Sequence, residues 1–296
     1  MRTTRWILLM LVALAATAAG AQSLYSDFYV IPVASHTPGR NGTTWMSDVA
    51  LLNLQNAPLD VQMVLIESGE GNADNVFPVT PSGNATATVP PSGSLLLQDV
   101  LNGFRANGVT GAILIGADRP FAVTSRSYSS SPGGNTIGQT VPPVRDFLEN
   151  VAGRSDQSAV AYIPGLQNNA RFRSNLGFVA GNTNTASGSV GVLVTVRNAA
   201  GGPIGSRLFT VPAGNFEHMQ FPVSSIIGNE AQFDIGSAEF RITGGNGAVV
   251  PYGSVVDNAT ADAAFISGQF PANAPLSAGK STAANPLREL FDRMRR

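Results

Sequence analysis

The chain of 296 residues has no cysteine, and only 12% of its residues are charged, about half the share of an ordinary soluble domain. The lack of cysteine excludes a disulfide scaffold, a cysteine-ligated zinc or iron–sulfur centre and a thiol nucleophile. A formal net charge of -1 gives no general electrostatic attraction to nucleic acid.

The first residues follow the order of a secretory signal peptide. Arg2 and Arg5 form a short positive region, and an uncharged apolar run covers residues 6–19. Small residues at 19–21 then resemble a cleavage site. The apolar run, about 14 residues, is short for a bilayer that needs about 20. We therefore expect residues 1–21 to be a signal peptide and the protein to be exported, either secreted or held in the periplasm or at the cell surface.

Short apolar runs rich in Val, Ile, Thr and aromatic residues follow, separated by turns rich in Gly, Pro, Asn and Ser. This spacing predicts β-sandwiches rather than alternating βα units. A short helix or wide turn is expected at 95–104, and a single helical turn at 146–150. The predicted strands are 28–33, 48–54, 61–67, 85–89, 112–115, 122–128, 159–163, 175–180, 190–197, 207–211, 217–221, 238–243 and 249–256.

The two halves of the chain match each other in order, which indicates a tandem duplication. The matching segments are 29–32 with 162–164, 45–51 with 172–178, and 89–93 with 211–214. Each half has the size of a β-sandwich of roughly 100 residues. We predict an all-β protein of two tandem Ig-like β-sandwich modules, at 28–144 and 159–268, joined by a linker at 145–158.

These motifs resemble those of exported bacterial proteins that carry tandem Ig-like modules. The pattern is Tyr-x-Pro, Trp-x-Ser-Asp, Val-x-Pro-Gly and Ser-Arg-Ser-Tyr, and it corresponds here to 29–32, 45–49, 89–93 and 125–128. Companion motifs stand at 172–176 and 254–258. The resemblance covers residues 28–268 and implies the fold and the export. The family has no established biochemical activity, so the resemblance implies none.

Patterns for catalysis and metal binding are missing from the sequence. There is no Gly-x-Ser-x-Gly elbow and no EF-hand calcium loop. Only two histidines occur, and we expect His36 in a solvated loop and His218 on the surface of a strand. The oxygen-rich segment 257–262 is expected to be an Asx-type turn that closes a strand. We predict no enzyme activity, no metal and no cofactor.

Three residues are candidates for ligand binding. Trp45 is the only tryptophan beyond the signal peptide, and its ring has the shape to stack on a sugar. Its counterpart in the second half is Phe172, which favours a packing role. Arg126 and Tyr128 alternate with serines, so both point to the same side of one strand. They form either a solvated face or a recognition face.

The C-terminal residues carry a clear local pattern. Residues 269–284, rich in Ala, Ser and Pro, predict a flexible linker. Residues 285–296 predict an amphipathic helix capped by Asn285, and its apolar stripe consists of Leu287, Leu290, Phe291 and Met294. So short a helix is marginal alone in water. It is expected to dock on its own sandwich, on a partner protein or on an anionic membrane surface, or to fray.

Together these observations favour a non-enzymatic exported module that binds a protein partner of the envelope or the extracellular space. Loops or an exposed strand edge would make the contact. The alternative is a carbohydrate-binding module that uses Trp45, Arg126 or Tyr128, with polysaccharide as the ligand. A hydrolase with an unrecognised carboxylate pair is a remote third possibility. We expect no nucleic-acid partner and no transmembrane segment after the signal peptide.

Overall fold

The computed structural model shows an all-β chain of antiparallel sheets with short helices α2 (Val100–Gly103) and α3 (Ser224–Ile227). None of the helices in the described residues is long and apolar enough to cross a membrane. The described residues are 25–39, 42–69, 85–104, 106, 108–130, 136–145, 148–150, 160–182, 188–212, 216–229, 231–245, 247–270, 288 and 291–292.

The N-terminal sheet runs in the order β4-β3-β6-β1-β2-β5, with β7 paired to β6. Its strands are β1 (Ser26–Pro38), β2 (Thr44–Asn53), β3 (Leu59–Glu67), β4 (Ala85–Val89), β5 (Ser94–Leu97), β6 (Val109–Ser130) and β7 (Thr136–Thr140). The first half of the 22-residue β6 pairs with β1 and β3, and its second half pairs with β2 and β7. This change of partners folds the sheet over an apolar core that includes Tyr29, Leu51 and Ile113.

The remaining strands form the C-terminal sandwich of two facing sheets. One has the order β13-β10-β15-β16, with β8 paired to β15, and the other has the order β12-β11-β14-β9. Its core includes Phe178, Val194 and Phe240. The strands are β8 (Leu148–Asn150), β9 (Val160–Asn168), β10 (Phe172–Asn182), β11 (Val190–Asn198), β12 (Pro203–Val211), β13 (Phe216–Pro222), β14 (Phe233–Gly244), β15 (Gly247–Asp257) and β16 (Ala263–Ser267).

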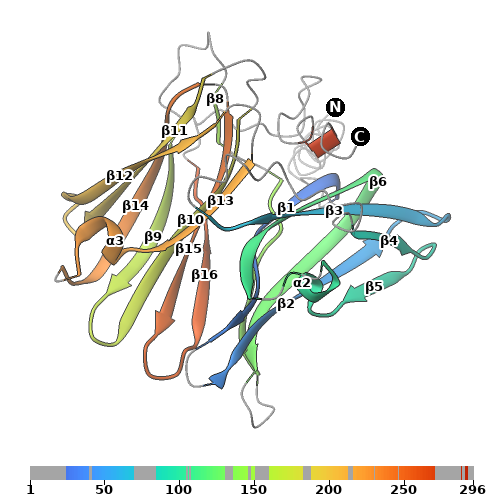
Figure 1. Cartoon of the computed structure of the whole chain (residues 1–296), viewed down its shortest axis with the longest axis horizontal. Helices are drawn as coiled ribbons and strands as arrows, with labels where there is room; N and C mark the ends of the chain where they lie inside the picture. The colour runs from blue at the N-terminus through green and yellow to red at the C-terminus, as the bar shows by residue number, and fades with distance from the viewer. Residues whose placement is uncertain are drawn as a thin grey trace, which may run out of the picture.

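The N-terminal sheet and the C-terminal sandwich lie side by side and share a third apolar cluster (Figure 1). Strands β1, β3 and β6 contribute to it with side chains that point away from their own core, whereas β10, β13 and β15 contribute from the other side. Strand β1 is buried without interruption from Phe28 to Ser35. Continuous burial of this kind is typical of a strand that is covered on both faces. The cluster consists of Phe28, Val30, Val64, Ile66, Ala112, Leu114, Val179, Phe216, Ala248, Val250 and Phe291.

The prediction of an all-β chain is confirmed, and most predicted strands lie inside observed ones. The separate strands predicted at 112–115 and 122–128 are one strand, β6, because Pro120 stands where the pairing changes and a missing N–H is tolerated there. The helical turn predicted at 146–150 is wrong, since β8 pairs with β15 there. Segment 95–104 splits into β5 and α2.

Tyr252 of β15 links the two parts, since it packs with the core of the N-terminal sheet. It lies beside Gly177 of β10, and a Cβ at Gly177 would collide with the Tyr252 ring. We expect Gly177→Ala to lower the free energy of unfolding by about 1–3 kcal/mol, because the ring must move out of a packed position. Urea denaturation measures this. In the matched control Gly244→Ala the new methyl group meets nothing, and equal losses in both variants would contradict the packing described here.

Candidate functional site

A cluster of polar side chains gathers around the buried carboxylate of Asp48 on β2. The side chain of Asp48 is only 3% exposed. Arg126 of β6 donates to its Oδ2 from Nε at 2.9 Å and from Nη2 at 2.7 Å. The hydroxyl of Tyr128 donates to Oδ1 at 3.2 Å, and the backbone N–H of Asp99 donates to the same atom at 2.9 Å. One carboxylate therefore holds three groups from two other segments of the chain.

The same cluster reaches β1 through Asp99. Its carboxylate accepts hydrogen bonds from His36 Nδ1 at 2.8 and 2.9 Å. The backbone of Asp99 is in the left-handed region, with φ of 45°, a conformation that aspartate tolerates better than most residues. The bond to Asp48 holds that conformation in place. His36 therefore lies on a strand in an ion-pair geometry, and its predicted place in a solvated loop is wrong.

The outward part of the cluster is a stacked pair. The guanidinium carbon of Arg126 lies 4.5 Å from the centroid of the Tyr128 ring, and the Arg126 side chain is 57% exposed. Burial, and then the Asp48 carboxylate, raise the pKa of Tyr128, so its hydroxyl stays a neutral donor. The pair presents to solvent a fixed cation that is stacked on an aromatic ring. These groups suit recognition.

Two of the three predicted ligand-binding residues thus meet, and the third does not. Trp45 lies three residues before Asp48 on β2, and because side chains alternate along a strand it points to the opposite face. Its half-buried ring packs close to Gly39. Sequence reasoning missed Asp48, although it stands in the Trp-x-Ser-Asp motif and pairs directly with Arg126 across the strands.

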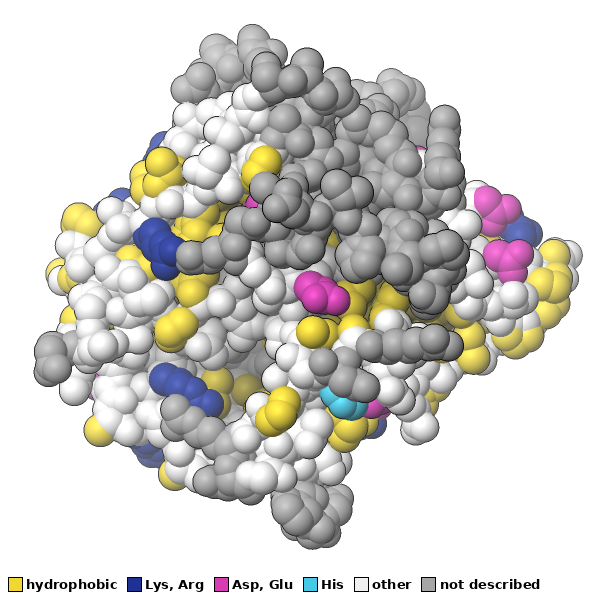
Figure 2. Space-filling model, viewed as in Figure 1, with side chains coloured by type: hydrophobic (Ala, Val, Ile, Leu, Met, Phe, Trp, Pro, Cys, Tyr) yellow, Lys and Arg dark blue, Asp and Glu magenta, His cyan; other side chains and the backbone are white. Residues whose placement is uncertain are grey.

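Exposed leucines flank the stacked pair. Leu96 of the edge strand β5 is opposite Ala50 of β2 and is 54% exposed, and Leu52 lies two residues further along β2 at 36%. Asp48, Leu52, Leu96, Arg126 and Tyr128 share one side of the sheet, and we call this surface the β2 face. In the view of Figure 2, hydrophobic side chains lie among uncharged polar ones, and charged side chains are few.

A second polar cluster lies buried where the N-terminal sheet meets the C-terminal sandwich. His218 of β13 is fully buried; its Nδ1 lies 2.5 Å from Ser68 Oγ and its Nε2 lies 2.8 Å from the Tyr252 hydroxyl. Both bonds are satisfied when Ser68 donates to Nδ1 and Nε2–H donates to Tyr252. Burial lowers the pKa of His218 to about 3, so the ring is neutral. Its predicted surface position is wrong.

Glu217, the neighbour of His218, does not form an acid–base pair with it. Adjacent residues of a strand point to opposite faces, and Glu217 points into the C-terminal sandwich. The residue is 1% exposed, and within the described part of the chain its Oε1 has no hydrogen-bond partner. Burial raises the pKa of Glu217 to about 7. Strongly shifted pKa values often mark functional groups, but here the two groups are separated by the sheet itself.

The C-terminal segment docks on its own chain at the residues that are described. Phe291 is fully buried against Phe28, with ring centroids 5.4 Å apart, and it fills the space above Gly116. Arg288 donates to the carbonyls of Asp27 at 2.8 Å and Ala117 at 3.0 Å. The other members of the predicted stripe, Leu287, Leu290 and Met294, lie outside the described residues.

Comparison with known proteins adds little to this geometry. No protein-family model matches the chain, and no curated protein matches it either. Among solved structures, it is similar to a chain in "Structure of infectious bursal disease virus Gx strain", with 11% identity over 84% of this chain and 73% of that one. The TM-score is 0.24, so no conclusion about fold or function is drawn from that likeness.

The buried carboxyl of Glu217 predicts a pH-dependent stability. Its pKa is raised from 4.5 to about 7 on folding, so the unfolded chain releases this proton first and stability falls as pH rises from 4.5 through 7. Glu217→Gln should remove that loss, which amounts to about 3 kcal/mol. Urea denaturation at pH 4.5, 6 and 8 measures the difference between the two proteins. His218 is present in both and cancels, and a difference that does not grow with pH would contradict the prediction.

Proposed function

We propose that this chain is an exported, non-enzymatic interaction protein that binds a protein partner at the cell envelope or outside the cell. In this proposal residues 1–21 are a signal peptide, and residues 28–144 and 159–268 are tandem Ig-like modules. The order of charge, apolar run and small residues at the N-terminus supports export. The antiparallel sheets that enclose separate cores in the two halves support the modules.

The observation that carries the proposal is the β2 face. Arginine and tyrosine are enriched at the centres of protein interfaces, and the stacked pair of Arg126 and Tyr128 is held there in one orientation by Asp48. A side chain that is already ordered loses less conformational entropy when a partner binds. The exposed side chains of Leu52 and Leu96 add apolar area beside the pair.

The position of the β2 face supports the same conclusion. The opposite layer of the N-terminal sheet already packs against the C-terminal sandwich, so its outer surface is in use. The β2 face ends at the edge strand β5, where a partner strand can pair with the sheet. These residues suit a sugar less well, because Arg126 covers the Tyr128 ring and is fixed there by two bonds to the buried Asp48. The Trp45 ring points to the other face of the sheet.

The test is a pull-down from a solubilised envelope extract with matched surface variants. Leu96→Asp places a charge in the β2 face, whereas Leu208→Asp places one on the outer side of β12, where Leu208 is 58% exposed. Both leucines are exposed, so both variants should fold with stability changes within about 0.5 kcal/mol. We expect the wild type and Leu208→Asp to capture the same discrete protein, and Leu96→Asp to lose it.

Two results count against the proposal. Capture by Leu96→Asp at the wild-type level would show that the β2 face is not the contact surface. Capture of no discrete protein by the wild type would remove the basis for a protein partner.

A further inference from the structure

We propose that a hollow at one end of the C-terminal sandwich binds a neutral oligosaccharide. The hollow lies between the turn that joins β9 to β10 and the turn that joins β15 to β16, and its volume is about 440 Å³. This volume is within the range of small-molecule sites, roughly 300–1,000 Å³. The residues that carry the argument are Gln167, Arg171, Phe172, Asp257 and Asp262.

The rim of the hollow is fixed by bonds between the two turns. The backbone N–H of Asn258 donates to the carbonyl of Arg171 at 2.7 Å, and its side-chain amide donates to Ala170 at 3.2 Å. Asp257 Oδ1 accepts from the N–H of Ala259 at 2.8 Å and of Thr260 at 3.3 Å, which confirms the predicted Asx-type turn. The hollow is therefore preorganised, and a ligand does not have to order these turns on binding.

The floor of the hollow is apolar and contains an aromatic ring. Phe172 lines it together with Val255 and Ile266. The guanidinium carbon of Arg171 lies 4.9 Å from the centroid of that ring, but its side chain is 73% exposed and its bond to Asp257 measures 3.3 Å. Although the Asp257 side chain is only 14% exposed, a single long bond from so exposed an arginine contributes little stability. Arg171 is therefore able to swing aside and leave the ring to an apolar sugar face.

The polar groups of the hollow suit hydroxyl groups. The Gln167 amide and the Asp262 carboxylate make no side-chain hydrogen bonds within the described part of the chain. They can therefore donate to and accept from the hydroxyl groups of a ligand at the edge of the ring. One cation and two carboxylates line the hollow, and this balance disfavours an anionic ligand. The apolar floor, the aromatic ring and the polar groups that can bind hydroxyls together fit a neutral saccharide.

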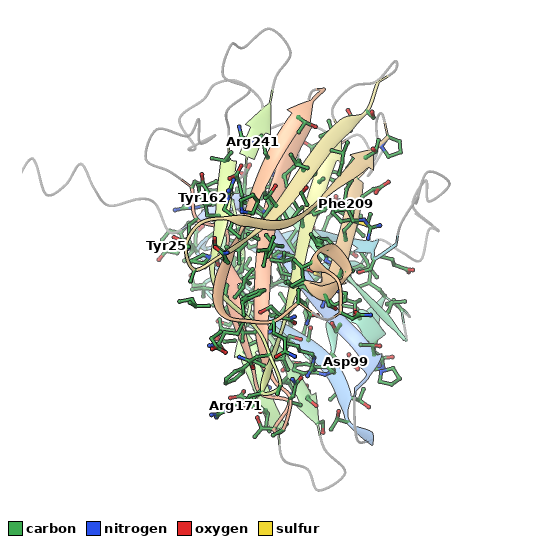
Figure 3. The ribbon with its side chains drawn as sticks, turned by 90° about the vertical axis from the view of Figure 1, so that its left-hand side faces the viewer. Tyr25, Asp99, Tyr162, Arg171, Phe209 and Arg241 are labelled. Carbon is green, nitrogen blue, oxygen red and sulfur yellow. The ribbon has the colours of Figure 1, made fainter. Side chains whose placement is uncertain are left out.

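This site is separate from the β2 face. In Figure 3, Arg171 lies near the lower end of the molecule, away from Arg241 near the upper end, and Asp99 of the Asp48 cluster lies off to the other side. Phe172 is the second-half counterpart of Trp45, so the aromatic position that the sequence singled out faces a hollow in the second half. The proposal does not depend on the protein partner.

The experiment is isothermal titration of the full chain with chitotetraose, cellotetraose and maltotetraose, and with tetragalacturonate as the anionic comparison. We expect saturable binding of at least one neutral tetrasaccharide and weaker binding of the anionic one. Phe172→Ala should weaken binding by about tenfold, the upper range of one aromatic contact. Phe172→Tyr keeps the ring and should restore it, and Leu208→Asp on the outer side of β12 should bind as the wild type does.

Gln167→Ala and Asp262→Ala change the hollow without disturbing the fold, because neither side chain makes a hydrogen bond to another described residue. Each should weaken binding while the melting temperature stays the same. Absence of binding by the wild type to all three neutral sugars at millimolar concentration would overturn the proposal. So would unchanged affinity in Gln167→Ala, Asp262→Ala and Phe172→Ala together.

Discussion

Most of β1, the second half of β3 and the first half of β6 form one layer that is buried on both faces, and the arrangement of the whole molecule depends on it. One side of this layer faces the core of the N-terminal sheet, and the other side faces β10, β13 and β15. Each large apolar side chain buried in this way contributes about 1.5–3 kcal/mol relative to exposure. The layer therefore joins two sets of sheets that each have a core of their own, and within the N-terminal sheet it leaves the opposite layer for contacts with other molecules.

Polar groups within this junction specify how the two parts fit. An apolar contact alone tolerates sliding, but the bond from His218 to Ser68 crosses between the two parts and requires one relative position. Gly177 leaves the space that the Tyr252 ring occupies, and Gly116 does the same for Phe291. Tyr252 packs with the N-terminal core while its strand belongs to the C-terminal sandwich. Phe291 of the C-terminal segment is a member of the apolar cluster that the two parts share.

Local sequence patterns predicted the strands well, because short apolar runs between turns depend mainly on neighbouring residues. The Asx-type turn at Asp257 and the apolar position of Phe291 were visible for the same reason. The pairing of strands across a sheet could not be predicted from the sequence. The continuity of β6 through Pro120 depends on which strands lie beside it, and the burial of His218 depends on a contact with Ser68, 150 residues away. The alternating pattern placed Arg126 and Tyr128 on one side, but only the register with β2 shows that Asp48 holds them.

The molecule thus displays two surfaces of different chemistry, the β2 face and the hollow beside Phe172, on parts that the junction holds together. The most direct test of this account is differential scanning calorimetry of the full chain. If the doubly buried layer joins the two parts, unfolding is a single transition whose calorimetric and van't Hoff enthalpies agree. Two separate transitions, one for the N-terminal sheet and one for the C-terminal sandwich, would contradict it.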